Sequence, residues 1–181
     1  DEPEDPELDL CIGDEEERVI IGDVGAAVVG AALGAVDAPL PFEEINLNRN
    51  RLTAAGIQLI AEGMGIAVGR GFLPNLRDVT VGAGAGAMTS NKPGDGGVAA
   101  LAEALADCAS LEGLWFQRCG VGGAGFEALA AHVHCWPRLQ VLDARWNPGP
   151  SDALGRALVG RGGRWDDGHW RSRPPTGAGL V

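Results

Sequence analysis

The sequence of 181 residues lacks a long apolar run, has a single lysine and contains no closely spaced pair of cysteines. Its longest apolar stretch, 24–36, is interrupted by glycines and falls short of the roughly 18 apolar residues that a membrane helix needs, so we expect no membrane partner. There is no starting methionine, no basic-then-apolar leader and no lipidation motif, and we expect a fragment or a processed product. The chain is long enough to close a core without disulfides, so we interpret the separate cysteines as reduced thiols of a cytoplasmic protein.

Most of the net charge of -11 lies at the start of the chain. Residues 1–17 contain ten acids and no base, which leaves fifteen acids and fourteen bases for the remainder. Because the body is nearly neutral and has one lysine, a broad phosphate-binding face is not expected, and neither is a nucleic-acid partner. We interpret 1–18 as an acidic N-terminal arm with a partial first repeat, 19–160 as the folded body, and 161–181, rich in Gly, Arg and Pro, as a loose tail.

Two patterns recur along the body. In the first, a glycine is followed at four-residue steps by two large apolar residues, which predicts a short amphipathic helix. Its copies begin at Gly25, Gly56, Gly97 and Gly125. The second pattern resembles Leu-x-x-Leu-x-Leu-x-x-Asn and has alternating central residues, which predict a short strand. It begins at residues 42, 76, 111 and 139, at intervals of 34, 35 and 28 residues, and the excess length falls in loops.

An incomplete unit precedes these copies, and the last unit continues beyond them. Leu8 and Leu10 form a possible strand that the helix over 24–33 would follow, and a final helix is expected near 154–158. Strands and helices therefore alternate through the body. A fixed repeat of this kind predicts a repeat architecture, because a lone strand-helix unit cannot bury its apolar face without neighbours.

One copy carries a family resemblance. The run Leu111-Glu-Gly-Leu114-Trp-Phe116-Gln-Arg-Cys119-Gly-Val121, followed by Gly125, Leu129 and Val133, resembles the ribonuclease-inhibitor type of leucine-rich repeat, whose unit has about 28 residues. The resemblance covers roughly residues 8–158. It implies an α/β leucine-rich-repeat solenoid of about four to five units over 19–160, with a curved parallel sheet on the concave face and helices on the convex face.

The ninth position of the strand pattern is expected to connect the units. Asn50 and Asn147 can donate side-chain hydrogen bonds to backbone carbonyls in the turn, and the Cys119 thiol can donate more weakly. Gly84 occupies this position in the second full unit and cannot donate. We therefore predict a broken ladder there, with local mobility over residues 82–96.

Two other clusters do not predict chemistry. The segment 79–87 resembles a dinucleotide-binding turn, but no helix follows its glycines directly and the next strand ends in Gln117 and Arg118 instead of an acid, so we interpret it as a rim loop. His132, His134 and Cys135 lack the paired spacing of a structural zinc site. No nucleophile elbow, paired carboxylates or Ser-His-Asp pattern occurs, and we expect neither enzymatic activity nor a metal or cofactor.

Residues between the buried strand positions are expected to point to the concave face. Tryptophan and arginine dominate protein-protein binding energy, and Arg118 beside Trp146 can add cation-π attraction. An alternative is that Trp146 covers the open end of the array and that Trp115 lies under a folded-back tail carrying Trp165 and Trp170. The predicted partner-binding residues are Asn46, Asn48, Arg49, Trp115, Gln117, Arg118, Asp143, Arg145 and Trp146.

These residues predict a monomeric recognition module that binds another protein through the concave face. Two alternatives stay open. Repeats of the ribonuclease-inhibitor type also occur in activators of the small GTPase Ran, so the resemblance equally allows a fragment that acts on a GTPase. The units can also be a spacer in a larger receptor or scaffold.

Overall fold

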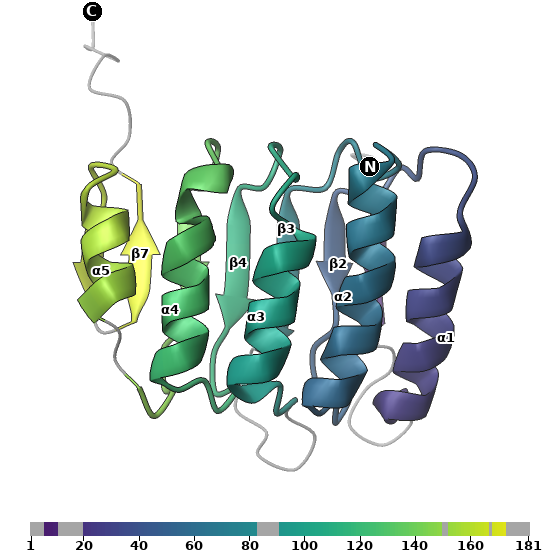
Figure 1. Cartoon of the computed structure of the whole chain (residues 1–181), viewed down its shortest axis with the longest axis horizontal. Helices are drawn as coiled ribbons and strands as arrows, with labels where there is room; N and C mark the ends of the chain where they lie inside the picture. Colours follow the sequence, from purple (N-terminus) through teal and green to yellow (C-terminus); the bar gives the residue numbers. More distant parts are fainter. Residues whose placement is uncertain (1–5, 11–19, 83–90, 150–151, 167, 173–181) are drawn as a thin grey trace, which may run out of the picture.

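In the computed structural model, strands and helices alternate along the described residues, which are 6–10, 20–82, 91–149, 152–166 and 168–172 (Figure 1). The elements are β1 (Glu7–Asp9), α1 (Gly22–Ala35), β2 (Glu44–Asn46), α2 (Ala54–Gly69), β3 (Asp78–Gly82), α3 (Gly94–Ala104), β4 (Gly113–Phe116), α4 (Gly123–His132), η1 (Val133–Cys135), β5 (Val141–Asp143), α5 (Asp152–Val159), β6 (Arg164–Asp166) and β7 (His169–Arg171). The predicted helices and strands of the body are confirmed. No described helix is both long and apolar enough to cross a membrane.

The described strands form one sheet with the order β1-β2-β3-β4-β5-β7-β6. Strands β1 to β5 pair in parallel with their neighbours in the chain. A parallel crossover has a fixed hand, so successive connecting helices lie on the same face of the sheet, and Figure 1 shows them side by side. We call the opposite face the open face. The fold is thus mixed α/β with two layers, a sheet and a row of helices along one of its faces.

A row of apolar side chains crosses the sheet and points toward the helices. Its members, at matching register positions, are Leu8, Ile45, Val79, Leu114, Leu142 and Trp170. All but Leu8 are buried, and each fully buried aliphatic side chain contributes about 1.5–3 kcal/mol to folding. The neighbours of this row in each strand point to the open face, because strand side chains alternate.

The glycine that begins the helix pattern has a steric role. An ideal Cβ on Gly25, Gly97 or Gly125 would lie 2.7 Å from a side-chain carbon of the residue four positions earlier. Real Cβ atoms do not approach carbon atoms this closely. The glycine therefore allows the first helical turn to pack on the residue that leads into it.

Side-chain amides link consecutive units, as predicted for Asn50 and Asn147. Asn50 Nδ2 donates to the carbonyl of Leu10 at 2.9 Å, and Asn147 Nδ2 donates to that of Phe116 at 2.8 Å. The Cys119 thiol makes only a long contact, 3.6 Å, with the carbonyl of Gln117 in its own unit. The ladder therefore depends on amides.

The predicted break in this ladder was wrong, because Asn91 occupies the place assigned to Gly84. Asn91 Nδ2 donates to the carbonyls of Leu47 and Val81 at 2.7 and 2.6 Å. Its Oδ1 accepts from the backbone N–H groups of Asn50 and Leu52 at 3.1 and 2.9 Å. The mobility predicted for 82–96 rested on the break, and residues 83–90 lie outside the described part of the chain.

The interpretation of 161–181 as a loose tail was wrong for residues 164–166 and 169–171. Strands β6 and β7 pair in an antiparallel hairpin, and β7 pairs antiparallel with β5. Trp170 is buried in the core row, next to Leu142. This hairpin covers the edge of β5 that the parallel strands leave unpaired, while residues 173–181 lie outside the described part.

Candidate functional site

The predicted partner-binding residues fall into two groups along the sheet and the turns that follow its strands. Asn46, Asn48 and Arg49 belong to β2 and the turn after it, and the others belong to β4, β5 and the turns after them. Strand β3 separates the groups. The structure therefore does not bring all the predicted residues together.

The group on β4 and β5 is connected through Asp143, whose carboxylate is buried. It accepts hydrogen bonds from Arg145 Nε at 2.9 and 3.1 Å, and the side chain of Gln117 also bonds to it. Burial alone would raise the pKa of Asp143, but the hydrogen bonds and charge of Arg145 outweigh burial and hold that pKa below its ordinary value. Asp143 is thus a fixed anion that orients the Arg145 guanidinium.

Trp146 is 60% exposed and lies beside two guanidinium groups. The Cζ atoms of Arg118 and Arg145 are 4.9 and 5.0 Å from its ring centroid, so the predicted contact with Arg118 is confirmed and Arg145 joins it. Each exposed cation-π contact contributes about 0.5–1 kcal/mol. The alternative that Trp146 covers the end of the array was wrong, because the β6–β7 hairpin pairs with β5 at that end.

The residue before each ladder position has an unusual backbone in several units. Arg49, Arg118 and Trp146 occupy this place with φ of 59°, 57° and 60°. The left-handed region costs a non-glycine residue about 1 kcal/mol, and strain of this kind gathers at functional sites. All three residues belong to the partner-binding set that the sequence predicts.

Trp115 lies flat along the open face, and Gly113 makes room for it. A Cβ on Gly113 would overlap the six-membered ring of the indole, as well as the Asp78 carboxylate on β3. Trp115 is half-buried by this packing. The folded tail extends the sheet beyond β5, with Trp170 in the core row, so the alternative that this tail covers Trp115 was wrong for the described residues.

Sequence reasoning missed a line of charged residues that crosses the open face, which we call the charge row. The register places its members side by side from β1 to β6: Glu7, Glu44, Asp78, Gly113, Val141, Arg171 and Arg164. It begins with acids and ends with arginines. The signal was available, since these positions precede the predicted binding columns by two residues and so share their face.

The acidic end of the charge row is electrostatically unfavourable. Burial, followed by the charge of Glu7, raises the pKa of Glu44. For Asp78, burial and then the charge of Glu112 raise the pKa. Arg77, which forms an ion pair with Glu43, lowers the pKa of Asp78 but does not outweigh these effects. Carboxylates are therefore held close together on β1–β3 without full compensation.

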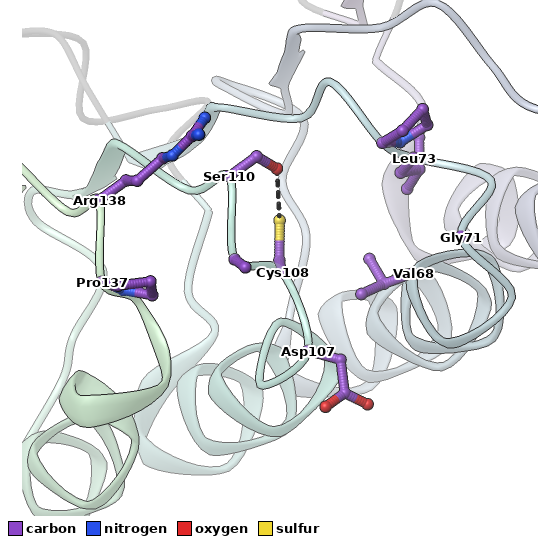
Figure 2. A pocket seen from close by; sticks show the side chains of 10 residues that line it. Val68, Gly71, Leu73, Asp107, Cys108, Ser110, Pro137 and Arg138 are labelled. Atoms are coloured by element: carbon purple, nitrogen blue, oxygen red, sulfur yellow. Dashed lines mark hydrogen bonds between the residues drawn. The ribbon is translucent and has the colours of Figure 1, made fainter.

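A hollow of about 420 Å³ lies between the connections that lead from helices α2, α3 and α4 to the next strands. Figure 2 shows its lining, with Cys108 and Ser110 at the centre. The Cys108 thiol contacts Ser110 Oγ at 3.6 Å and the carbonyl of Leu76 at 3.4 Å, and burial raises its pKa. A thiol with a raised pKa is a poor nucleophile, so this hollow has no activated group.

The two histidines near the end of α4 contact residues that are close to them in the sequence. His132 Nδ1 lies 2.8 Å from the carbonyl of Ala128, and His134 Nε2 lies 3.5 Å from Cys135 Sγ. Within the described ranges, no group of three or more His, Cys, Asp or Glu is placed to hold a metal ion. The glycine-rich segment considered for nucleotide binding lies mostly in 83–90, outside these ranges.

No protein-family model matches the chain, and no curated protein is significantly similar to it in sequence. The residues of the sheet and its turns therefore carry the indications of function. Two features stand out: exposed Trp146 with its two arginines, in the turn after β5, and the charge row on the open face.

Proposed function

We propose that this chain is a leucine-rich-repeat solenoid of the ribonuclease-inhibitor type that binds another protein through its open face, the concave face of such a solenoid. The exposed Trp146 beside Arg118 and Arg145 carries the proposal. Tryptophan and arginine are the residue types most enriched at the energetic centres of protein interfaces. A tryptophan in water, held by cations on a strained turn, is pre-organised for contact.

Three repeated features support the solenoid part of the proposal. The core row keeps one register through the parallel strands, the ladder amides recur at unit ends, and the left-handed residue recurs just before the ladder position. Repeat units share their apolar faces with neighbours and leave the strand face opposite the helices available to partners. In this proposal, the protein acts in the cytoplasm and has no catalytic role.

Among the described residues, the open face has anchors and fixed charges and no activated nucleophile. Asp143 is bound to Arg145 and has a lowered pKa, so it is not a general acid at neutral pH. Burial raises the pKa of the Cys119 thiol to about 12, so this thiol stays protonated. These protonation states of Asp143 and Cys119 are compatible with a role of the open face in binding a partner.

The test is the replacement of Trp146 by alanine. The variant and the wild-type chain are used as baits, with captured proteins quantified by mass spectrometry and the affinity then measured for the captured partner. We expect an affinity loss of about 2 kcal/mol, or about thirtyfold, as for a central interface tryptophan. Folding should be unchanged, because most of the indole is already in water.

Val159→Ala is the matched control, since Val159 is also an exposed large apolar residue, 54% exposed, but lies on α5 in the helix layer. Its affinity should equal that of the wild-type chain. Equal affinity of the folded Trp146→Ala variant would contradict the proposed function.

A further inference from the structure

The two ends of the charge row are far enough apart to act separately. Glu44 and Arg171 are four strand positions apart, which at about 4.8 Å per strand gives about 19 Å. Fields between exposed charges decay over about 8 Å at physiological salt. The acids on β1–β3 and the arginines on β7 and β6 therefore do not neutralise one another, and each end attracts its own counter-charge.

Opposite charge is incomplete at each end of the row. At the acidic end, Glu7 and Asp78 both belong to the charges that raise the pKa of Glu44. A cation placed there would relieve this repulsion. At the basic end, Arg164 pairs with the exposed Asp166, whereas Arg171 makes no ion pair within the described residues.

The middle of the row is uncharged and suited to an apolar contact. Gly113 and Val141 separate the acids from the arginines. The Trp115 indole covers Gly113 and is half-exposed. A segment lying along the row would therefore meet acids, then an aromatic surface, then arginines.

From this arrangement, we propose that the open face recognises a segment of another protein with basic side chains at one end and acidic side chains at the other, separated by about six residues. The spacing is that of an extended chain, about 3.3 Å per residue, laid across the strands from Glu44 to Arg171. This inference rests on the proposed function and specifies the chemistry of its partner. Charge complementarity of this kind sets orientation and association rate as well as affinity.

A synthetic peptide provides the probe. It carries lysines at one end and glutamates at the other, with about six uncharged residues between them. Its control is an isomer of the same composition with lysines and glutamates intermixed. Binding to the full chain is measured by fluorescence anisotropy at low and at physiological salt. We expect the segregated peptide to bind about tenfold more tightly than the intermixed isomer.

Charge reversals locate the contact. Reversing one end alone, by Glu44→Lys with Asp78→Lys or by Arg164→Glu with Arg171→Glu, should reduce affinity about tenfold. Reversing both ends together should restore it, because the same peptide then binds in the opposite direction. Glu62→Lys with Glu103→Lys, on exposed positions of α2 and α3, is the matched control and should leave affinity unchanged.

Three results would overturn the inference. The first is equal binding of the two peptide isomers, and the second is failure of the double-end reversal to restore affinity. The third is self-association of the wild-type chain in sedimentation experiments that either single-end reversal abolishes, since a second copy would then be the occupant. If Trp146→Ala weakens capture of the natural partner but the charge reversals do not, the proposed function stands and this inference fails. If none of these variants changes binding, both fail.

Discussion

Asn91→Ala tests the amide that replaces the predicted glycine in the ladder. Asn91 is 1% exposed, donates to two carbonyls and accepts from two backbone N–H groups. Alanine would remove all four hydrogen bonds, although the Leu47 carbonyl keeps its bond from Asn50 Nδ2 at 3.1 Å, and a buried group left unsatisfied costs about 1–3 kcal/mol. Because such losses are not additive among neighbours, we expect the free energy of unfolding to fall by about 3 kcal/mol.

The assay is urea unfolding followed by circular dichroism, together with a thermal melt. A loss of this size should lower the melting temperature by about 6–12 °C for a chain of this length. Asn75→Ala is the control, since Asn75 is exposed. Asn91→Asp should also destabilise at neutral pH, because it removes both donors and places a negative charge against the carbonyls. If Asn91→Ala unfolds at the same urea concentration as Asn75→Ala, the ladder role of Asn91 is refuted.

Two further predictions concern the open face. Asp143→Asn should destabilise the protein by about 2 kcal/mol at pH 7, because it weakens charged hydrogen bonds to Arg145. The pKa of Asp143 is lowered in the folded state, so its stabilisation is present above the unfolded pKa of about 3.9 and is lost as pH falls through the folded pKa. Urea titrations should show the difference between wild type and variant shrinking below about pH 4, and a constant difference would contradict this account. Gly113→Ala should displace the Trp115 indole toward water and shift its fluorescence to longer wavelength, with no shift in a Trp115→Phe background; an unchanged spectrum in Gly113→Ala would mean that the ring does not rest on Gly113.

Much of the fold could be predicted because two local periodicities repeat. Four-residue spacing from a glycine gives a helix with one apolar stripe, and two-residue alternation gives a strand with one buried side. The ladder position was misassigned because the prediction assumed a constant distance from strand to amide. Asn91 follows the glycine-rich insertion, so the chain reaches the same structural position several residues later.

The folded hairpin was missed for a different reason. Residues 161–181 contain no helix-type repeat, but Trp165 and Trp170 flank an Asp-Gly pair, and Asp-Gly between strand residues is a hairpin signal. Its pairing with β5 depends on an edge created by the rest of the sheet, which no local pattern contains. Only the tertiary structure shows that Trp170 completes the core row.

The candidate site was predictable only in part. Alternation placed Trp115 beside Asp143, and the register confirms this pairing. It did not show that Asp143 is neutralised by Arg145, that Trp115 lies on Gly113, or that acids gather on β1–β3. Each of these depends on side-chain direction or on charges from several strands, and neither is set by spacing within one strand.

The antiparallel hairpin also determines how a protein of this design can change in size. Its strand β7 occupies the edge of β5 with which a further parallel strand-helix unit would pair. Duplicated units would instead have to enter between existing parallel neighbours, and each insertion would move the acidic and basic poles apart by about 4.8 Å. In the proposed binding mode, the number of units would then set the length of the segment that can reach both charged ends.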